Sequence, residues 1–234
     1  MTAGLHPFDA PLVEGRLVRR YKRFLADVET ADGRVTAHCP NPGSMLGMAE
    51  PGMRVMLRHV AGPRRRLAWT WELVATDDRT WVGCNTMRPN AVVEHFIRQG
   101  VVPGLSADRG MRREVRYGRN SRIDLLLGDE ERTYVEVKNT TLAREGVALF
   151  PDAVTARGAK HMEDLATVAE AGHGAVVVFF VNRSDCGAFD VARDIDPAYG
   201  AAFDLAEVAG VRMVPLGMDV SPAGWRVRGV LPRA

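Results

Sequence analysis

The chain has 234 residues, of which 46% are hydrophobic and 26% charged, ordinary values for a globular protein. This length fits one large domain or two small ones. The longest apolar run, residues 175–181, is too short to cross a bilayer, and the N-terminus lacks the basic and apolar segments of a signal peptide. Three widely spaced cysteines without a CxxC pair argue against a disulfide framework and a zinc site. We therefore expect a reduced, cytoplasmic compartment and no membrane partner.

The formal net charge of +2 conceals an uneven distribution along the chain. Residues 1–123 carry a net charge of +8, and residues 124–234 carry −6. The cations are 28 arginines and only 3 lysines, namely Lys22, Lys138 and Lys160. A basic half joined to an acidic half favours a polyanionic partner, whereas arginine richness alone can reflect genomic composition and solvated surface.

Residues 1–85 have the pattern of an all-β domain. Segments rich in Val, Leu, Trp and Thr alternate with turn residues such as Asp32-Gly33 and Pro51-Gly52. We expect strands near residues 12–18, 23–29, 34–39, 53–60, 67–75 and 80–85. About six short strands in such a length predict a small barrel.

After residue 86 the pattern becomes mixed, and we place a domain boundary there. Apolar residues recur at helical spacing within residues 89–99, and Gly100 is suited to follow the end of that helix. Further helices are expected near residues 154–171 and 197–209. Strands are expected near residues 111–117, 121–127, 132–138, 174–182, 211–216 and 225–230. Residues 86–234 are therefore predicted to form a mixed sheet with helices packed on it.

Two consecutive strands of this second domain, SRIDLLL and RTYVEVK, each carry an acid on a face that looks buried. If residues 129–131 form the loop between them, Asp124 lies opposite Glu136 with Cβ atoms about 4.5–5.5 Å apart. A loop one residue longer would place Asp124 opposite Val135 and destroy this arrangement. Strict alternation predicts that the apolar face of the first strand consists of Ile123, Leu125 and Leu127.

Two carboxylates this close repel each other unless a cation or a proton lies between them. Oxygen ligands without nearby His or Cys favour Mg²⁺ or Mn²⁺ over zinc, and we expect the metal at Asp124, Glu136 and Val137. Lys138 shares a face with Glu136, where it can orient an attacking water or stabilise charge in the transition state. This arrangement is used for metal-assisted phosphodiester hydrolysis. A cross-strand Glu–Lys surface pair gives the same pattern and stays an alternative.

Longer stretches resemble a known family. They are RLVRRYKRFLADV (16–28), AHCPNPGSM (37–45), TWELV (70–74), SRIDLLL (121–127), YVEVKN (134–139) and FPDAV followed by KH (150–161). Over nearly the whole chain, they are similar to the sugar fermentation stimulation protein family. The chain departs from the family pattern at Pro42, where the family has Thr and therefore a hydroxyl.

This resemblance implies an α+β protein with two domains. The first, residues 1–85, is an OB-fold-like barrel that binds nucleic acid, and the second, residues 86–234, is an α/β domain of the PD-(D/E)XK nuclease type. The family motif maps without a gap onto Asp124, Glu136 and Lys138. The resemblance further implies non-specific DNA binding and a regulatory role in sugar (maltose) metabolism.

Other side chains are candidates with alternatives of their own. Glu94 lies mid-helix, and in related nuclease folds an acid of the first helix completes the metal shell, so we include it as catalytic beside the alternative of a helix-surface carboxylate. Glu114, Asp152 and Lys160 are left open as site residues, with a salt bridge as the alternative for Glu114 and a helix N-cap for Asp152. His161 has no second ligand near it in the sequence, so no metal role is expected.

Three basic clusters are candidates for nucleic-acid contacts. They comprise Arg19, Arg20, Tyr21, Lys22 and Arg23; Arg64, Arg65 and Arg66; and Arg112, Arg113, Arg116, Arg119 and Arg122. Phosphate contacts by such residues give salt-dependent, sequence-independent affinity, and nearby aromatic rings can stack on unpaired bases. A solvated basic face is the alternative. We prefer the third cluster as the lining of a cleft because it runs into the strand of Asp124.

Two functions of different kinds follow from these patterns. The first is a DNA-binding protein with a nuclease site that depends on Mg²⁺ or Mn²⁺. The second is a DNA-binding regulator that keeps a nuclease fold with little or no turnover. A carbohydrate-processing enzyme has little support, because Lys138 has no place in glycosidase chemistry. We expect DNA as the partner, bound without sequence specificity, and leave a homodimer open.

Overall fold

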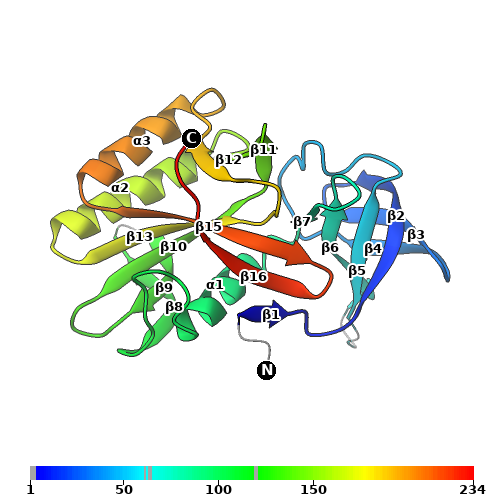
Figure 1. Cartoon of the computed structure of the whole chain (residues 1–234), viewed down its shortest axis with the longest axis horizontal. Helices are drawn as coiled ribbons and strands as arrows, with labels where there is room; N and C mark the ends of the chain where they lie inside the picture. The colour runs from blue at the N-terminus through cyan, green and yellow to red at the C-terminus, as the bar shows by residue number, and fades with distance from the viewer. Residues whose placement is uncertain (1–3, 61, 63–64, 119–120) are drawn as a thin grey trace.

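The computed structural model describes residues 4–60, 62, 65–118 and 121–234. In Figure 1 the strands within residues 12–75, in blue and cyan, form a barrel at one end of the molecule. The rest of the chain forms a larger sheet with helices packed on it (Figure 1). The predicted α+β class is confirmed, as are the small barrel and the mixed sheet with helices.

The barrel is built from the first part of the chain. Its strands are β2 (Leu12–Tyr21), β3 (Leu25–Thr30), β4 (Gly33–His38), β5 (Arg54–His59) and β6 (Trp69–Ala75). Parallel pairing of β4 with β6 closes the barrel, with Ala37 opposite Trp69 and His38 opposite Thr70. The interior is filled by apolar side chains that include Leu17, Val28, Val55 and Trp71. Closure removes the exposed edges that an open sheet of this size would leave.

The second part is a seven-stranded sheet in the order β1-β16-β15-β13-β10-β9-β8. Its strands are β1 (Leu5–Pro7), β8 (Met111–Tyr117), β9 (Ser121–Leu127), β10 (Thr133–Thr140), β13 (Gly174–Val181), β15 (Arg212–Ser221) and β16 (Gly224–Val230). β13 pairs in parallel with β10 on one side and β15 on the other, whereas the outer pairs are antiparallel. The predicted mixed sheet is therefore confirmed.

Helices cover both faces of this sheet. They are α1 (Pro89–Arg98), α2 (Ala156–Glu170) and α3 (Pro197–Val208). α1 packs into one apolar core with Val135 and Val178, whereas α2 and α3 pack into another with Val177 and Phe179. Because successive residues of a strand point to opposite faces, the apolar run of β13 serves both cores.

The helix ends follow from the local sequence. Pro89 opens α1, where its missing N–H costs nothing, and Gly100 follows the helix with a positive φ of 68°. Thr155 caps α2 by accepting the N–H of Gly158 at 3.0 Å. The expectation that Asp152 caps this helix is therefore wrong, because the helix begins later, at Ala156.

The barrel and the sheet are joined through β7 (Trp81–Gly83). The N–H of Gly83 donates to the Asn182 carbonyl at 2.9 Å, and the Asn182 side chain donates back to the Gly83 carbonyl at 3.1 Å. A Cβ at position 83 would lie 2.2 Å from that side chain, so only glycine fits. Leu73 and Trp81 extend the α1-side core onto the outer wall of the barrel. The core that contains α1 therefore spans both parts, while the barrel keeps its own interior core.

Four short strands depart from the expected pattern. β1 pairs with β16, so residues 5–7 belong to the second sheet and not to a barrel over residues 1–85. β11 (Leu142–Arg144), β12 (Val147–Phe150) and β14 (Ala188–Val191) form a small separate sheet. Strands of three or four residues are too short to show an alternating pattern.

None of the described helices has the length and apolar character needed to cross a bilayer. Cys39, Cys84 and Cys186 are free and buried, in agreement with the expectation that they form no disulfide framework.

Candidate functional site

The two predicted acidic strands pair in the predicted register. β9 and β10 are antiparallel, with Leu127 opposite Thr133 and Leu125 opposite Val135. Continuing this register places Asp124 opposite Glu136. At this point the Val137 N–H donates to Asp124 Oδ2 at 2.8 Å. In a regular antiparallel pair, a backbone carbonyl of the neighbouring strand would accept this hydrogen bond. The site therefore lies where the two strands separate and a side chain replaces a backbone partner.

Asp124 is held from both sides. Besides Val137, the Asn90 side-chain amide at the start of α1 donates to Asp124 Oδ1 at 2.7 Å. Burial raises the pKa of Asp124 from its usual 3.8 to about 6, and the negative charge of Glu136 adds to this effect. The elevated pKa reflects two acids close together in a space that disfavours charge.

Glu136 is only 4% exposed and has two cationic or polar neighbours. Its Oε1 accepts from Lys138 Nζ at 2.8 Å and contacts His161 Nδ1, while the two nitrogens lie 3.3 Å apart. Burial alone would raise the pKa of Glu136, but the contacts with His161 and Lys138 outweigh it and lower that pKa. Its Oε2 is buried and has no hydrogen-bond partner among the described residues. One carboxylate oxygen is thus left available to a ligand.

Two residues of the site were not predicted from the sequence. Asn90 lies in the first turn of α1, one turn before Glu94 on the same helix face. His161 lies on the buried side of α2 with Met162 and Leu165. The helical spacing of these buried residues could have placed His161 on the face of α2 toward the sheet, but nothing in the sequence indicated that Glu136 would meet it.

The predicted catalytic Glu94 contacts arginines. It is buried, and its carboxylate pairs with Arg98 at 2.9 Å and with Arg113 of β8. On α1 it lies one turn beyond Asn90, which makes the contact with Asp124. The structure thus places Glu94 beside the site, with both of its oxygens in ion pairs.

The three open candidates lie in different surroundings. Glu114 is exposed, has a positive φ of 54° and occupies the position opposite Asp124 where regular β8–β9 pairing is interrupted. Lys160 pairs with Asp164 at 2.6 Å and donates to Ser121 at 2.9 Å. Asp152 is exposed in the segment before α2. Among the described residues, none of the three forms a hydrogen bond or an ion pair with Asp124 or Glu136.

The first basic cluster, at the turn between β2 and β3, has structural partners. Arg20 donates to the backbone carbonyls of Arg23, Asn41, Gly43 and Ser44. Arg19 pairs with Asp27 at 2.9 Å and lies over the Tyr21 ring, whose hydroxyl also donates to Asp27. Lys22 and Arg23 have positive φ values, and both are exposed in the turn.

Arg20 is therefore expected to matter more for stability than for nucleic-acid contact. Replacing Arg20 by Ala leaves the loop of residues 41–44 without these donors, and we expect a loss of about 1–3 kcal/mol in the free energy of unfolding. Denaturant melts of Arg20→Ala and of Lys22→Ala, whose side chain makes no such contact in the described structure, measure the difference. Equal midpoints for the two variants would contradict this role.

The other two clusters are only partly described. Arg64 and Arg119 lie outside the described residues, while Arg65 and Arg66 are exposed. Arg112 pairs with Asp129 at 3.2 Å. Arg116 and Arg122 face each other across β8 and β9 and line a pocket of about 320 Å³ together with Tyr117 and Ser121.

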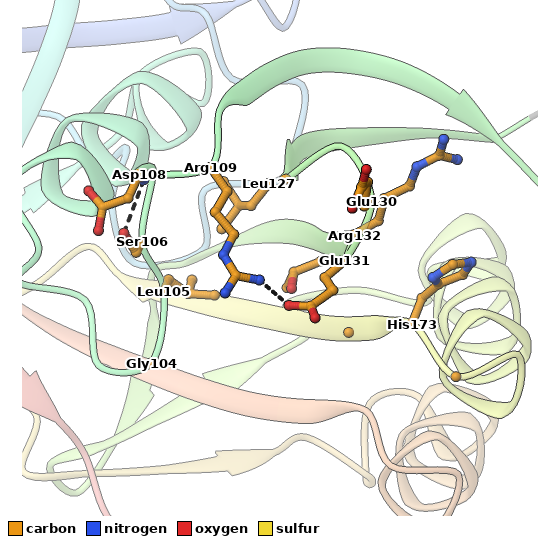
Figure 2. Close-up of a pocket in the computed structure, with 14 residues that line it drawn as sticks. Gly104, Leu105, Ser106, Asp108, Arg109, Leu127, Glu130, Glu131, Arg132 and His173 are labelled. Carbon is orange, nitrogen blue, oxygen red and sulfur yellow. Dashed lines mark hydrogen bonds and ion pairs between the residues drawn. The ribbon is translucent and has the colours of Figure 1, made fainter.

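A larger pocket of about 520 Å³ lies at the opposite end of the β9–β10 pair (Figure 2). Figure 2 shows Arg109 directed toward Glu131, with which it forms an exposed ion pair. Thr133 lines this pocket, and Lys138 is five residues further along β10, about 16 Å away at the usual rise of a strand. The pocket is therefore separate from the acidic site and contains none of its predicted residues.

The raised pKa of Asp124 implies that the stability of the metal-free protein depends on pH. Because the pKa is higher in the folded state than the usual 3.8, Asp124 favours folding at acid pH, and this contribution is lost as the pH rises through about 6. We expect Asp124→Asn to be more stable than the parent near pH 8, by about 1–3 kcal/mol. Near pH 5 the difference should shrink. Thermal melts in EDTA at both pH values measure it, and a lower stability of the variant at the higher pH would contradict the prediction.

The sequence was compared with known families. Residues 18–84 match the "SfsA N-terminal OB domain", and residues 87–224 match the "Sugar fermentation stimulation protein RE domain". The chain belongs to the sugar fermentation stimulation protein family. The resemblance of the quoted sequence stretches to this family is thus confirmed, and two of them meet in the fold, because Arg20 binds carbonyls of the CPNPGS loop.

Relatives of the family cover almost the whole chain. A sugar fermentation stimulation protein homolog of Ruegeria sp. (strain TM1040) is 47% identical over 229 residues, which are 96% of this chain and 99% of that protein. The homolog of Rhodospirillum centenum is 52% identical over 221 residues, 93% and 94% of the two chains. The structure of Pyrococcus furiosus SfsA, described as a complex with Ca²⁺, covers 99% of both chains with a TM-score of 0.88 and 24% identity. This last likeness confirms the fold.

Proposed function

We propose that the chain is a DNA-binding protein with a metal-dependent phosphodiesterase site at Asp124, Glu136 and Lys138. The observation that carries the proposal is the pair of opposed acids, half-buried Asp124 and buried Glu136, the second of which has a free oxygen, Oε2. Burial is the main cause of the raised pKa of Asp124, and a divalent cation there would offset the repulsion from Glu136 that adds to it. No group of three or more His, Cys, Asp and Glu side chains suited to a metal occurs among the described residues, so the other ligands would be backbone, water or substrate oxygens.

The residues present fit Mg²⁺ or Mn²⁺. Asp124 and Glu136 supply carboxylate oxygens, and hard oxygen ligands suit these ions. The Val137 N–H points toward β9, so its carbonyl points to the same side and is available as a further oxygen. Pyrococcus furiosus SfsA is described as a complex with Ca²⁺, another oxygen-preferring cation, which supports this choice.

Each side chain then has a defined task. A bound divalent ion lowers the pKa of a coordinated water and stabilises charge on a phosphoryl oxygen. Lys138 Nζ, already fixed against Glu136, would hold the attacking water or the developing negative charge. His161 and Asn90 keep the two acids in place from opposite faces of the sheet.

A cleavage assay tests the proposal. We expect the purified protein to cut supercoiled, linear or branched DNA in Mg²⁺ or Mn²⁺ and to leave it intact in EDTA. Binding of DNA without cleavage in either metal would overturn the nuclease proposal and support the second candidate, a DNA-binding regulator of sugar metabolism. The name shared by the relatives refers to the stimulation of sugar fermentation, and this is the link to sugar metabolism in that candidate.

A further inference from the structure

A pocket outside the acidic site lies at the junction of the barrel and α1. Its volume is about 270 Å³. The side chains that matter here come from β4, β5, β6, the loop between β5 and β6, and the segment before α1. They are His38, Arg58, Arg65, Thr70, Asn85 and Arg88. No acidic residue is among the described residues that line it. A concave site with several arginines and no lining acid has the chemistry of an anion site.

A buried carboxylate holds two of these arginines in place. The Glu72 side chain is fully buried, and Arg58 Nε donates to its Oε1 at 2.7 Å. Arg88 Nη2 donates to the same oxygen at 3.0 Å, and Asn85 donates to Oε2 at 2.7 Å. Asp9 contacts both guanidinium groups on the outer side. The two arginines are therefore oriented before any ligand arrives, which reduces the entropy lost on binding.

Donors remain free to bind a ligand. Arg58 uses Nε and Nη1 in its ion pairs, and Arg88 uses Nε and Nη2, so each keeps one terminal nitrogen without a partner among the described residues. Arg65 donates to Thr70 at 2.9 Å and pairs with no acid in the described parts of the chain. Burial and the charge of Arg65 lower the pKa of His38, so its ring is neutral at pH 7.

The charges indicate the class of anion. Glu72 and Asp9 balance Arg58 and Arg88, which leaves the charge of Arg65 as the net positive charge at the pocket. A phosphodiester of a nucleic-acid backbone carries a single negative charge and matches this value, whereas free phosphate and pyrophosphate carry more.

The position of the pocket links it to the acidic site. Arg88 precedes α1 directly, and Asn90, which donates to Asp124, follows two residues later, about 3 Å along the helix axis. We propose that this pocket binds a backbone phosphodiester of the DNA strand close to the bond at Asp124 and Glu136. The assignment rests on the proposed function, since it takes DNA as the ligand.

Salt dependence of DNA binding gives the first test. Fluorescence anisotropy in EDTA compares the parent with Arg65→Ala and with Arg34→Ala, a control that removes the same charge from β4 but does not line the pocket. We expect Arg65→Ala to lower the slope of log affinity against log salt by about 0.9 on duplex or about 0.7 on single-stranded DNA. Arg34→Ala should keep the parental slope. Equal slopes for all three proteins would overturn the assignment.

Neutral backbone linkages give the second test. A methylphosphonate is placed at one position at a time along the oligonucleotide, and the affinity is measured for the parent and Arg65→Ala. We expect one position at which the neutral linkage weakens the parent but leaves Arg65→Ala unaffected. Identical profiles for both proteins would overturn the assignment. Calorimetric titration with inorganic pyrophosphate tests whether the pocket binds a small anion instead. If pyrophosphate binding depended on Arg65 while DNA affinity did not, the ligand would be a small anion, and the assignment to a DNA phosphodiester would be overturned.

Cleavage of the same oligonucleotides in Mg²⁺ separates the two proposals. Cleavage by the parent with identical profiles would overturn the pocket assignment and leave the nuclease intact. An Arg65-dependent profile without cleavage would support the pocket and overturn the nuclease. Circular dichroism melts of both variants confirm that lost binding is not lost folding.

Discussion

Glu136→Gln is expected to slow metal-dependent cleavage of DNA severely while leaving the fold intact. Gln has nearly the same shape, and its Oε1 can still accept from Lys138 and His161, so the packing around it is preserved. The change removes one ligand charge from a cation site. A loss of several kcal/mol in transition-state stabilisation corresponds to a rate about 10³-fold lower. Initial rates in Mg²⁺ and Mn²⁺ at matched salt measure it.

The control for this variant is Glu207→Gln on α3, which makes the same chemical change in an ion pair with Arg233. We expect it to cleave like the parent. If Glu136→Gln cleaved as well as the parent, the activity would belong to another site or to a contaminating nuclease.

Glu136→Gln should keep its affinity for DNA in EDTA although it loses cleavage activity. Loss of the Glu136 charge removes a repulsion toward the phosphate backbone and frees Lys138 Nζ from its charged partner. Affinity should therefore stay the same or rise slightly. A large loss of affinity instead would show that the Glu136→Gln substitution has disturbed the fold around β10, and a thermal melt would reveal it.

The register that pairs Asp124 with Glu136 could be predicted from the sequence, because it depends on whether the loop between their strands has an odd or an even number of residues. Shifting a strand by one residue moves every side chain to the other face. The short loop between the two strands and the apolar pattern of each strand therefore leave few possible registers. The same reasoning failed within β9. Ile123 packs in the core below α2, whereas Leu125 and Leu127 pack below α1, so the predicted single apolar face is wrong. Alternation breaks at Asp124, where regular pairing with β8 is interrupted at Glu114.

Residues whose roles depend on distant partners could not be predicted. His161 meets Glu136 because α2 packs over β10, and the distance along the chain between them carries no sign of this. Arg20 looked like a phosphate ligand, but its donors are used by carbonyls about twenty residues away. Pairing of β1 with β16 joins the two ends of the chain, and a three-residue strand has no pattern to indicate it. Local sequence thus specifies elements and register better than it specifies long-range polar contacts.

Lys138→Met is expected to lower cleavage by about 100-fold or more without removing either metal ligand. Lys138 is largely buried, with its ammonium fixed between Glu136 and His161, so Met can fill the space of the side chain but supplies no donor or charge. Metal-free DNA binding should weaken modestly because a positive charge is lost. Cleavage rates and affinities at matched salt measure both effects.

The pH dependence distinguishes the loss of a positioned ammonium from a general loss of charge. The Lys138 ammonium helps to lower the pKa of Glu136, so in Lys138→Met that pKa rises and the acid limb of the cleavage profile should move to higher pH. The matched variant is Lys160→Met, which removes the same charge, but its ammonium pairs with Asp164 and Ser121. We expect Lys160→Met to keep the parental profile. An equal loss of rate in both lysine variants, with no shift of the acid limb, would mean that the reaction depends on net charge near the acidic site and not on the contact of Lys138 with Glu136.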